Sequence, residues 1–315
     1  MLKDIARIAR FFPASLAGAG IGLAAFDAIA IEPNLVRVRR VMVPATCCGA
    51  QIAGLKLAHI SDLHIMGRGW RRGTVARAIE ACNLADVDLV AITGDFIGSG
   101  DGAHVAVEML SALRADIPRV AVLGNHDHVH GRRYENMLLD GLRRLGIVVL
   151  ENEAVTLRLP QGPTWVAGVD DGYTLRDDLR AALRGLDSDD YPRILLTHYP
   201  EVAEQLRPGQ VQLSLAGHSH AGQIGIPILA TMMYNAHART KYGKGLFMVN
   251  GNPLYVSAGV GMSGIPMRFR NVPEVVLINL VAARSPGSLT TTALSEKEQP
   301  QISRARSLVP LWPYM

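Results

Sequence analysis

Along the first half of the chain, short apolar runs alternate with segments that have apolar residues at helical spacing. The apolar runs, bounded by turn residues, predict strands at 55–60, 89–92 and 120–123. Helical spacing between them predicts helices at 73–85 and 103–114. Strands and helices that alternate in this way are typical of a parallel sheet covered by helices.

After Leu150 the pattern changes to a series of strands with few helices between them. The predicted strands are 154–159, 164–168, 193–197, 211–216, 246–249, 254–258 and 275–281, with short helices near 177–185 and 200–206. A further strand at 35–43 comes first in the chain, and Pro44 ends it. We therefore expect an α/β fold of the α+β sandwich type, with two packed mixed β-sheets flanked by helices.

The first 33 residues differ from the rest. Three basic residues, Lys3, Arg7 and Arg10, precede an apolar run at 11–31 that is long enough to cross a bilayer. Pro13, three glycines and Asp27 weaken the run as a membrane span. We predict a single membrane anchor or signal-anchor in the inner or plasma membrane. A cleaved signal peptide and a soluble N-terminal helix are the alternatives. Because basic residues flank both ends of the run, the side of the membrane stays open.

We divide the chain into the anchor or signal segment 1–33, a catalytic domain 34–284 and a disordered tail 285–315. Lys and Arg number 32 and Asp and Glu 28, a net charge of +4 that is too diffuse to indicate a nucleic-acid partner. The three cysteines, Cys47, Cys48 and Cys82, fit neither a disulfide framework nor a paired zinc motif.

Polar side chains with metal-binding chemistry follow five of the predicted strands, at the point where each strand ends. These residues are Asp62, His64, Asp95, Asn125, His198, His218 and His220. The carboxyl ends of the strands form the ligand crevice of open α/β sheets, so we expect the seven to converge. Carboxylate, imidazole and amide donors in mixture suit Mn²⁺, Fe or Zn²⁺. Seven donors are too many for one tetrahedral ion, so two divalent ions are expected.

Five motifs in this order resemble the signature blocks of calcineurin-like metallophosphoesterases. They are His59–His64, Gly94–Asp95, Gly124–Asp127, His198 and Gly217–His220, within roughly residues 55–222. Segments at 221–224, 241–246 and 255–259 are similar to a membrane-anchored subgroup of phosphodiesterases and UDP-2,3-diacylglucosamine pyrophosphatase-like proteins. The resemblance implies a hydrolase acting on phosphoric ester or pyrophosphate bonds.

The resemblance also implies a role for each residue. Asp62, His64, Asp95 and His220 would hold one ion, and Asp95, Asn125, His198 and His218 the other, with Asp95 bridging. His126 would be the general acid or would contact the phosphate, and Asp127 would orient it. Two ions a few ångströms apart favour attack on phosphorus by an activated water.

The anchor and the subgroup resemblance favour an amphiphilic substrate. A lipid-linked molecule such as UDP-2,3-diacylglucosamine, an intermediate of lipid A biosynthesis, is the specific hypothesis. We expect a phosphorylated substrate and a membrane as partners, and no nucleic acid. The basic loop Arg68–Arg72, with Trp70, and the segment Met232–Tyr234 are expected to face the bilayer. A general or cyclic-nucleotide phosphodiesterase and a non-catalytic metal-holding envelope protein are the alternatives.

Overall fold

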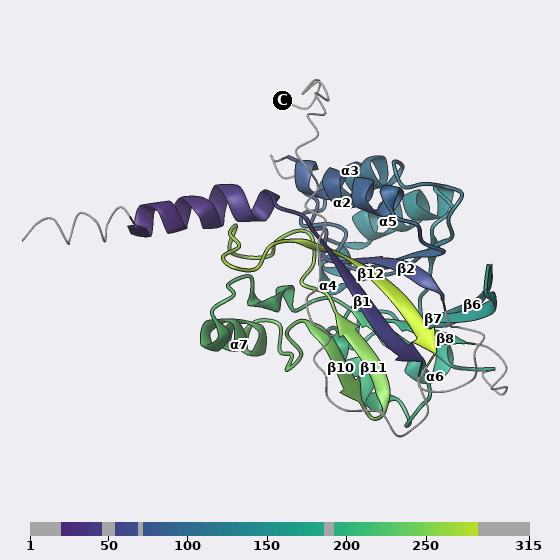
Figure 1. Cartoon of the computed structure of the whole chain (residues 1–315). Coiled ribbons are helices and arrows are strands. Elements are labelled where there is room, and N and C mark those ends of the chain that lie inside the picture. The colour runs from purple at the N-terminus through teal and green to yellow at the C-terminus, as the bar shows by residue number, and fades with distance from the viewer. Residues whose placement is uncertain (1–19, 46–53, 69–71, 186–191, 283–315) are drawn as a thin grey trace, which may run out of the picture. The chain divides into compact units, whose positions relative to one another are not determined.

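Two mixed six-stranded sheets make up the centre of the structure, a computed structural model that describes residues 20–45, 54–68, 72–185 and 192–282 (Figure 1). The first sheet has the order β1-β12-β2-β3-β4-β5, and the second has the order β10-β11-β9-β8-β7-β6. Helices flank the sheets, so the predicted fold class is confirmed for the described residues.

The strands of the first sheet are β1 (Arg37–Ala45), β2 (Lys56–Ile60), β3 (Leu89–Thr93), β4 (Arg119–Val122), β5 (Val148–Val149) and β12 (Glu274–Ala282). Those of the second are β6 (Glu153–Leu159), β7 (Gly162–Gly168), β8 (Arg193–Leu196), β9 (Leu213–Ala216), β10 (Gly245–Val249) and β11 (Asn252–Val256). Strands β2 to β5 are mutually parallel, as are β7, β8, β9 and β11. Each sheet thus gathers several carboxyl ends at one edge, where a ligand crevice forms.

The helices are α2 (Arg72–Leu84), α3 (Gly102–Leu110), α4 (Asn125–Val129), α5 (Arg132–Arg144), α6 (Leu179–Ala182) and α7 (Pro227–Ala236). Helices α2, α3 and α5 lie together over one face of the first sheet (Figure 1). In β3, Val90 and Ile92 pack toward these helices, whereas Leu89 and Ala91 pack into the layer between the sheets. Burial on both faces explains why this strand is an unbroken apolar run in the sequence.

Some elements differ from the sequence prediction. The predicted helix at 200–206 is a 3₁₀ segment, Pro200–Gln205, and α6 is shorter than the predicted 177–185. Helices α4, α5 and α7 were not predicted. The spacing of Leu138, Leu139 and Leu142, which form the buried face of α5, is a helical signal in the sequence. Helix α7 has no buried residue, so its sequence carries no inward-facing stripe.

The described part of the N-terminal segment is helical. Residues 20–26 are α-helical, and they continue into Asp27–Ile31 and Glu32–Asn34. Ala28 and Pro33 are buried against the domain, where the Ala28 carbonyl accepts from the Arg268 N–H at 2.9 Å. Within the described ranges no helix combines the length and the apolar character that crossing a bilayer requires. Residues 1–19 of the predicted anchor, Cys47, Cys48, Trp70, Arg71 and the predicted tail 285–315 lie outside the described residues.

A buried arginine shapes the loop between β11 and β12. The side chain of Arg268 is fully buried and donates to the carbonyls of Ala258 (2.8 Å), Gly259 (3.1 Å), Gly261 (2.6 Å) and Asn271 (3.1 Å). One guanidinium group therefore provides hydrogen-bond donors to carbonyls at both ends of this loop.

Replacing this arginine should destabilise the fold. Arg268→Met removes the donors and leaves several buried carbonyls unsatisfied, so we expect the free energy of unfolding to fall by about 3–5 kcal/mol. Urea denaturation measures the change. The exposed Arg180→Met is the matched control and should stay within about 0.5 kcal/mol of the parent. A small effect at Arg268 would mean that the loop does not depend on it.

Candidate metal centre

All seven predicted ligands come together where the carboxyl ends of the two sheets meet. Asp62 and His64 follow β2, and Asp95 follows β3. Asn125 begins α4 directly after β4, His198 follows β8, and His218 with His220 follow β9. Six of the seven are buried, and Asn125 is half-buried.

One group of donors combines two carboxylates and two imidazoles. The donor atoms of Asp62, His64, Asp95 and His220 all lie within 4.8 Å of one another. Nε2 of His64 lies 3.3 Å from Oδ2 of Asp95, and Nε2 of His220 lies 3.4 Å from Oδ1 of Asp62. The two Nε2 atoms are 2.9 Å apart. Such a set of convergent nitrogen and oxygen donors fits a divalent cation.

A second group lies on the other side of Asp95. Nε2 of His198 lies 3.4 Å from Oδ2 of Asp95 and 3.2 Å from Oδ1 of Asn125. Nδ1 of His218 is 3.0 Å from that amide oxygen and 3.1 Å from Nε2 of His198. Asp95 Oδ2 therefore belongs to both groups.

Backbone carbonyls orient the imidazoles of the second group. Nδ1 of His198 donates to the Thr93 carbonyl at 2.8 Å, and Nε2 of His218 donates to the Ala238 carbonyl at 2.9 Å. The opposite nitrogen of each ring points at Asn125, where it can bind a cation once it carries no proton. Such outer contacts select the tautomer and the ring orientation of metal-binding histidines.

The backbone at the site is strained. Five of the predicted ligands have a left-handed φ, which residues other than glycine adopt at a cost of about 1–3 kcal/mol each. They are Asp62 (52°), His64 (44°), Asp95 (53°), His218 (70°) and His220 (49°). Glycine allows the close approach between these turns: a Cβ at Gly124 would lie 2.6 Å from the Asp95 nitrogen and 2.9 Å from the His198 ring.

Electrostatics keep several imidazoles neutral. Burial lowers the pKa of His64 and of His218 to about 3 and lowers that of His220 as well. Burial also lowers the pKa of His198, but Asp95 outweighs it and raises this pKa well above its ordinary value. Likewise, burial raises the pKa of Asp95, but His198 outweighs it, so the net shift is downward. Neutral imidazoles beside an ionised carboxylate are suited to bind a cation.

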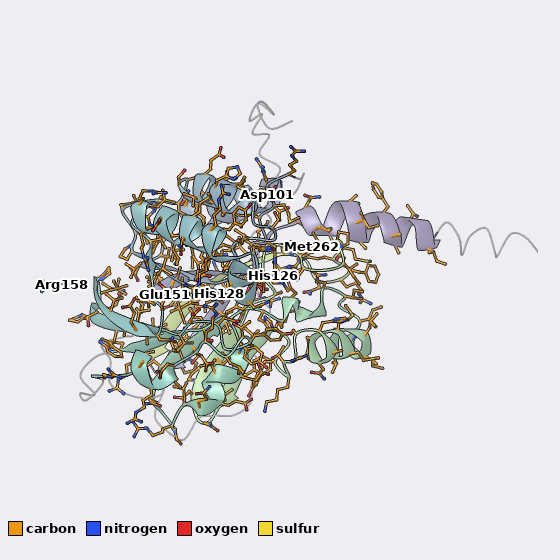
Figure 2. All side chains as sticks on the ribbon, turned by 180° about the vertical axis from the view of Figure 1, so that it is seen from behind. Asp101, His126, His128, Glu151, Arg158 and Met262 are labelled. Atoms are coloured by element: carbon orange, nitrogen blue, oxygen red, sulfur yellow. The ribbon has the colours of Figure 1, made fainter. Side chains whose placement is uncertain are left out.

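His126 lies at the mouth of the site. Its backbone N–H donates to Oδ1 of Asp95 at 2.8 Å, and its ring nitrogen Nε2 lies 3.3 Å from the Ser263 hydroxyl. The ring is half-buried and borders two cavities. Figure 2 labels His126 on α4 close to Met262, which lies on the loop before β12.

Asp127 contacts the backbone and not the His126 ring. Its Oδ2 accepts from the Gly124 N–H at 2.9 Å, and its Oδ1 accepts from the Ile97 N–H at 3.2 Å. Burial, with a smaller contribution from the charge of Asp95, raises its pKa to about 7. In this structure Asp127 therefore holds the start of α4. Among the described residues its carboxylate makes no contact with the His126 ring that would support the expected role in orienting it. Its catalytic role stays a prediction.

Several site residues were not predicted from the sequence. Ser263 contacts His126, and the rings of Tyr173 and Tyr199 pack on His218 at centroid distances of 4.8 and 5.3 Å. Ser263 and Tyr173 lie in loops and belong to no motif, so no pattern in the sequence marks them. Tyr199 directly follows His198, and its position was the only signal for it.

Comparison with known proteins agrees with this geometry. The sequence profile of the calcineurin-like phosphoesterases matches residues 55–222. The chain is 29% identical over 270 residues to the uncharacterized metallophosphoesterase YkuE of Bacillus subtilis, covering 84% of this chain and 91% of that protein. It is 27% identical over 232 residues to the phosphodiesterase YaeI of Escherichia coli, covering 73% and 83%. A transmembrane protein with metallophosphoesterase domain from Danio rerio is 31% identical over 269 residues, covering 78% of this chain and 58% of that protein.

Metal binding should release a proton. Because the pKa of His198 is raised above 6.5, this ring is protonated at neutral pH when no ion is bound, and a cation must displace that proton. We therefore expect a net release of protons on metal binding, and an affinity for Mn²⁺ that falls as the pH is lowered. Calorimetry of the chelator-treated protein in buffers of different ionisation enthalpy measures the release. The same heat in every buffer would contradict the prediction.

Proposed function

The chain belongs to the calcineurin-like phosphoesterase family, whose members are hydrolases of phosphoester bonds, and on this premise we propose that it uses two divalent ions, Mn²⁺, Fe or Zn²⁺. The observation that carries the proposal is the position of Asp95, whose Oδ2 atom belongs to both groups of donors. Carboxylates that bridge two cations are characteristic of dinuclear hydrolytic sites.

When bound, the ions supply an acidified water and the positive charge that the phosphate oxygens need. The residues of the chain hold and orient the reactants. The carbonyls of Thr93 and Ala238 keep His198 and His218 in the tautomers that leave one nitrogen free. His126, steadied by Ser263, is placed to donate a proton to the leaving oxygen.

We further propose that the substrate is amphiphilic, with a lipid-linked pyrophosphate such as UDP-2,3-diacylglucosamine as the specific candidate, and that residues 1–33 anchor the chain to a membrane. Helix α7 supports this substrate class. Its Ile228 and Met232 are 78% and 61% exposed. Its Met233 and Tyr234 line a cavity of about 300 Å³, and Asp95 and His218 line the same cavity. An apolar helix at the mouth of a phosphoesterase site suits a substrate presented by a lipid surface.

A general phosphodiesterase with a soluble substrate is the second candidate. The name of the Escherichia coli relative, phosphodiesterase YaeI, favours it. A panel containing bis-p-nitrophenyl phosphate, cyclic AMP and a UDP-linked lipid, tested with Mn²⁺ after chelation, separates the candidates. If the full chain turns over the UDP-linked lipid faster than the two soluble substrates, the amphiphilic substrate is supported. Equal or slower turnover of the lipid contradicts it.

Removing the shared carboxylate should abolish metal binding and turnover together. Asp95→Ala takes away one donor from each group, so we expect elemental analysis to find metal lost from both and hydrolysis of bis-p-nitrophenyl phosphate to fall to background. Asp101→Ala, which removes an exposed carboxylate from the neighbouring loop, is the control and should keep both. Two ions per chain with normal turnover in Asp95→Ala would exclude the bridging role.

Changing His126 should separate catalysis from metal binding. Because its ring is outside both groups of donors, His126→Gln should retain the metal while kcat falls by roughly 10²–10⁴, the usual contribution of one acid-base group. Metal content and kcat are measured on the same preparation. A parallel loss of both would identify His126 as a ligand.

A further inference from the structure

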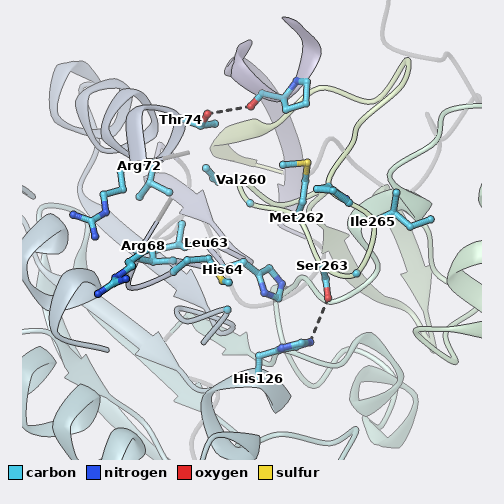
Figure 3. A pocket seen from close by; sticks show the side chains of 18 residues that line it. Leu63, His64, Arg68, Arg72, Thr74, His126, Val260, Met262, Ser263 and Ile265 are labelled. Carbon is cyan, nitrogen blue, oxygen red and sulfur yellow. Dashed lines mark hydrogen bonds between the residues drawn. The ribbon is translucent and has the colours of Figure 1, made fainter. Parts of the chain in front are cut away.

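We propose that a second cavity beside the metal centre binds a hydrocarbon chain of the substrate, an inference that rests on the proposed phosphoesterase function. This cavity has a volume of about 350 Å³, within the range of small-molecule pockets (Figure 3). We call it the apolar lobe. It is separate from the cavity over Asp95 and His218, although His126 and the loop Ser263–Ile265 border both.

Four parts of the chain that are distant in sequence build the apolar lobe. Pro33 comes from the N-terminal segment, Leu63 from the turn after β2, Val75 from α2, and Val260 with Met262 from the loop between β11 and β12. Leu63, Val75 and Val260 are at most 4% exposed, so their side chains form a buried apolar wall.

Most of the polar groups on this wall are already engaged or face water. The hydroxyl of Thr74 donates to the Pro33 carbonyl at 3.0 Å, as Figure 3 shows. Arg72 donates to the Gly67 carbonyl through one terminal nitrogen, whereas its Nε is buried without a hydrogen-bond partner among the described residues, and Arg68 is exposed. The interior of the lobe therefore favours an apolar occupant, because a polar group placed there would lose its hydrogen bonds to water.

The lobe joins the metal centre directly. His64, a predicted ligand, and His126, the predicted acid, both line it, and their ring centroids lie 4.7 Å apart (Figure 3). A phosphate held at the metal centre would therefore leave its ester chain at the entrance of the apolar lobe. This continuity identifies the occupant as part of a phosphorylated substrate.

The N-terminal segment places the lobe beside the proposed anchor. Pro33 lies near the end of the helical stretch that the structure describes from residue 20 to Asn34, and Ala28 in that stretch accepts a hydrogen bond from the Arg268 backbone N–H. A chain anchored through residues 1–33 would thus have the lobe close to the lipid, where a fatty acyl or a prenyl chain can enter. Both chains share the same chemistry, a flexible hydrocarbon attached near a phosphate.

The test measures binding of alkylphosphonates, whose phosphorus–carbon bond resists hydrolysis, to the Mn²⁺-loaded full chain. In a series from ethyl to dodecyl phosphonate, below micelle-forming concentrations, we expect Kd to fall by up to about fourfold per buried methylene and then to level off. Calorimetry gives Kd, and a farnesyl phosphonate distinguishes a preference for a prenyl chain from one for a straight chain. A Kd that does not depend on chain length would overturn the proposal.

Variants of the lobe show where the hydrocarbon chain of the ligand binds. Val75→Phe fills the lobe from α2 and should reduce the ratio of ethyl to dodecyl Kd at least tenfold, whereas Val148→Phe on β5 is the matched control and should keep the ratio. If Val75→Phe does not fold, Met262→Ser, which makes the wall polar, replaces it with the same expectation. If the ratio of ethyl to dodecyl Kd is unchanged in the lobe variants, the proposal is overturned, because the alkyl chain would then bind elsewhere, for example on α7.

Turnover separates this proposal from the proposed function. Alkyl p-nitrophenyl phosphates of the same chain lengths share one leaving group, so hydrolysis of the ethyl ester reports the chemistry alone. Chain-dependent binding with no hydrolysis of any ester would support the apolar lobe and contradict the phosphoesterase proposal. Hydrolysis of the esters with a kcat/KM and a Kd that do not depend on alkyl chain length would support the phosphoesterase proposal and contradict the apolar lobe.

Discussion

The carboxylate of Asp95 is the group on which the rest of the site depends. Its Oδ2 lies within 3.4 Å of the imidazoles of both His64 and His198, and its Oδ1 accepts the backbone N–H of His126. One side chain after β3 thus connects the turn after β2, the start of α4 and the end of β8. Two separate sheets must bring their carboxyl ends to one point for these contacts to form, and a buried negative charge there calls for cations.

The local structure is arranged to keep that geometry. Left-handed backbone at Asp62, Asp95 and His218 is unfavourable in isolation, and it persists where the surrounding structure fixes it. Glycines make the close approach possible, since a Cβ at Gly217 would collide with Ser61 and Asp62. Arg268 then holds the neighbouring loop, whose residues also border His126 and the apolar lobe.

Much of the fold and of the candidate metal site could be predicted, because the same segments carry the hydrophobic pattern of the strands and the polar residues that follow them. Apolar runs such as 89–92 mark buried strands, and the acid that follows marks a strand end. The order of strands was not predictable, because β12 lies between β1 and β2 although it is the last strand of the described residues. Helix α7 has no buried face, and Ser263 belongs to no motif, so only the folded chain shows that they border the site. The backbone contacts of Asp127 likewise depend on how α4 begins.

Anomalous diffraction from crystals of the full chain loaded with Mn²⁺ tests the dinuclear site directly. We expect two manganese peaks, one bound by His64 and His220 and the other by His198 and His218, with the Asp95 carboxylate bound to both. A single peak, or two peaks of which only one contacts Asp95, would contradict the claim that this carboxylate organises the site.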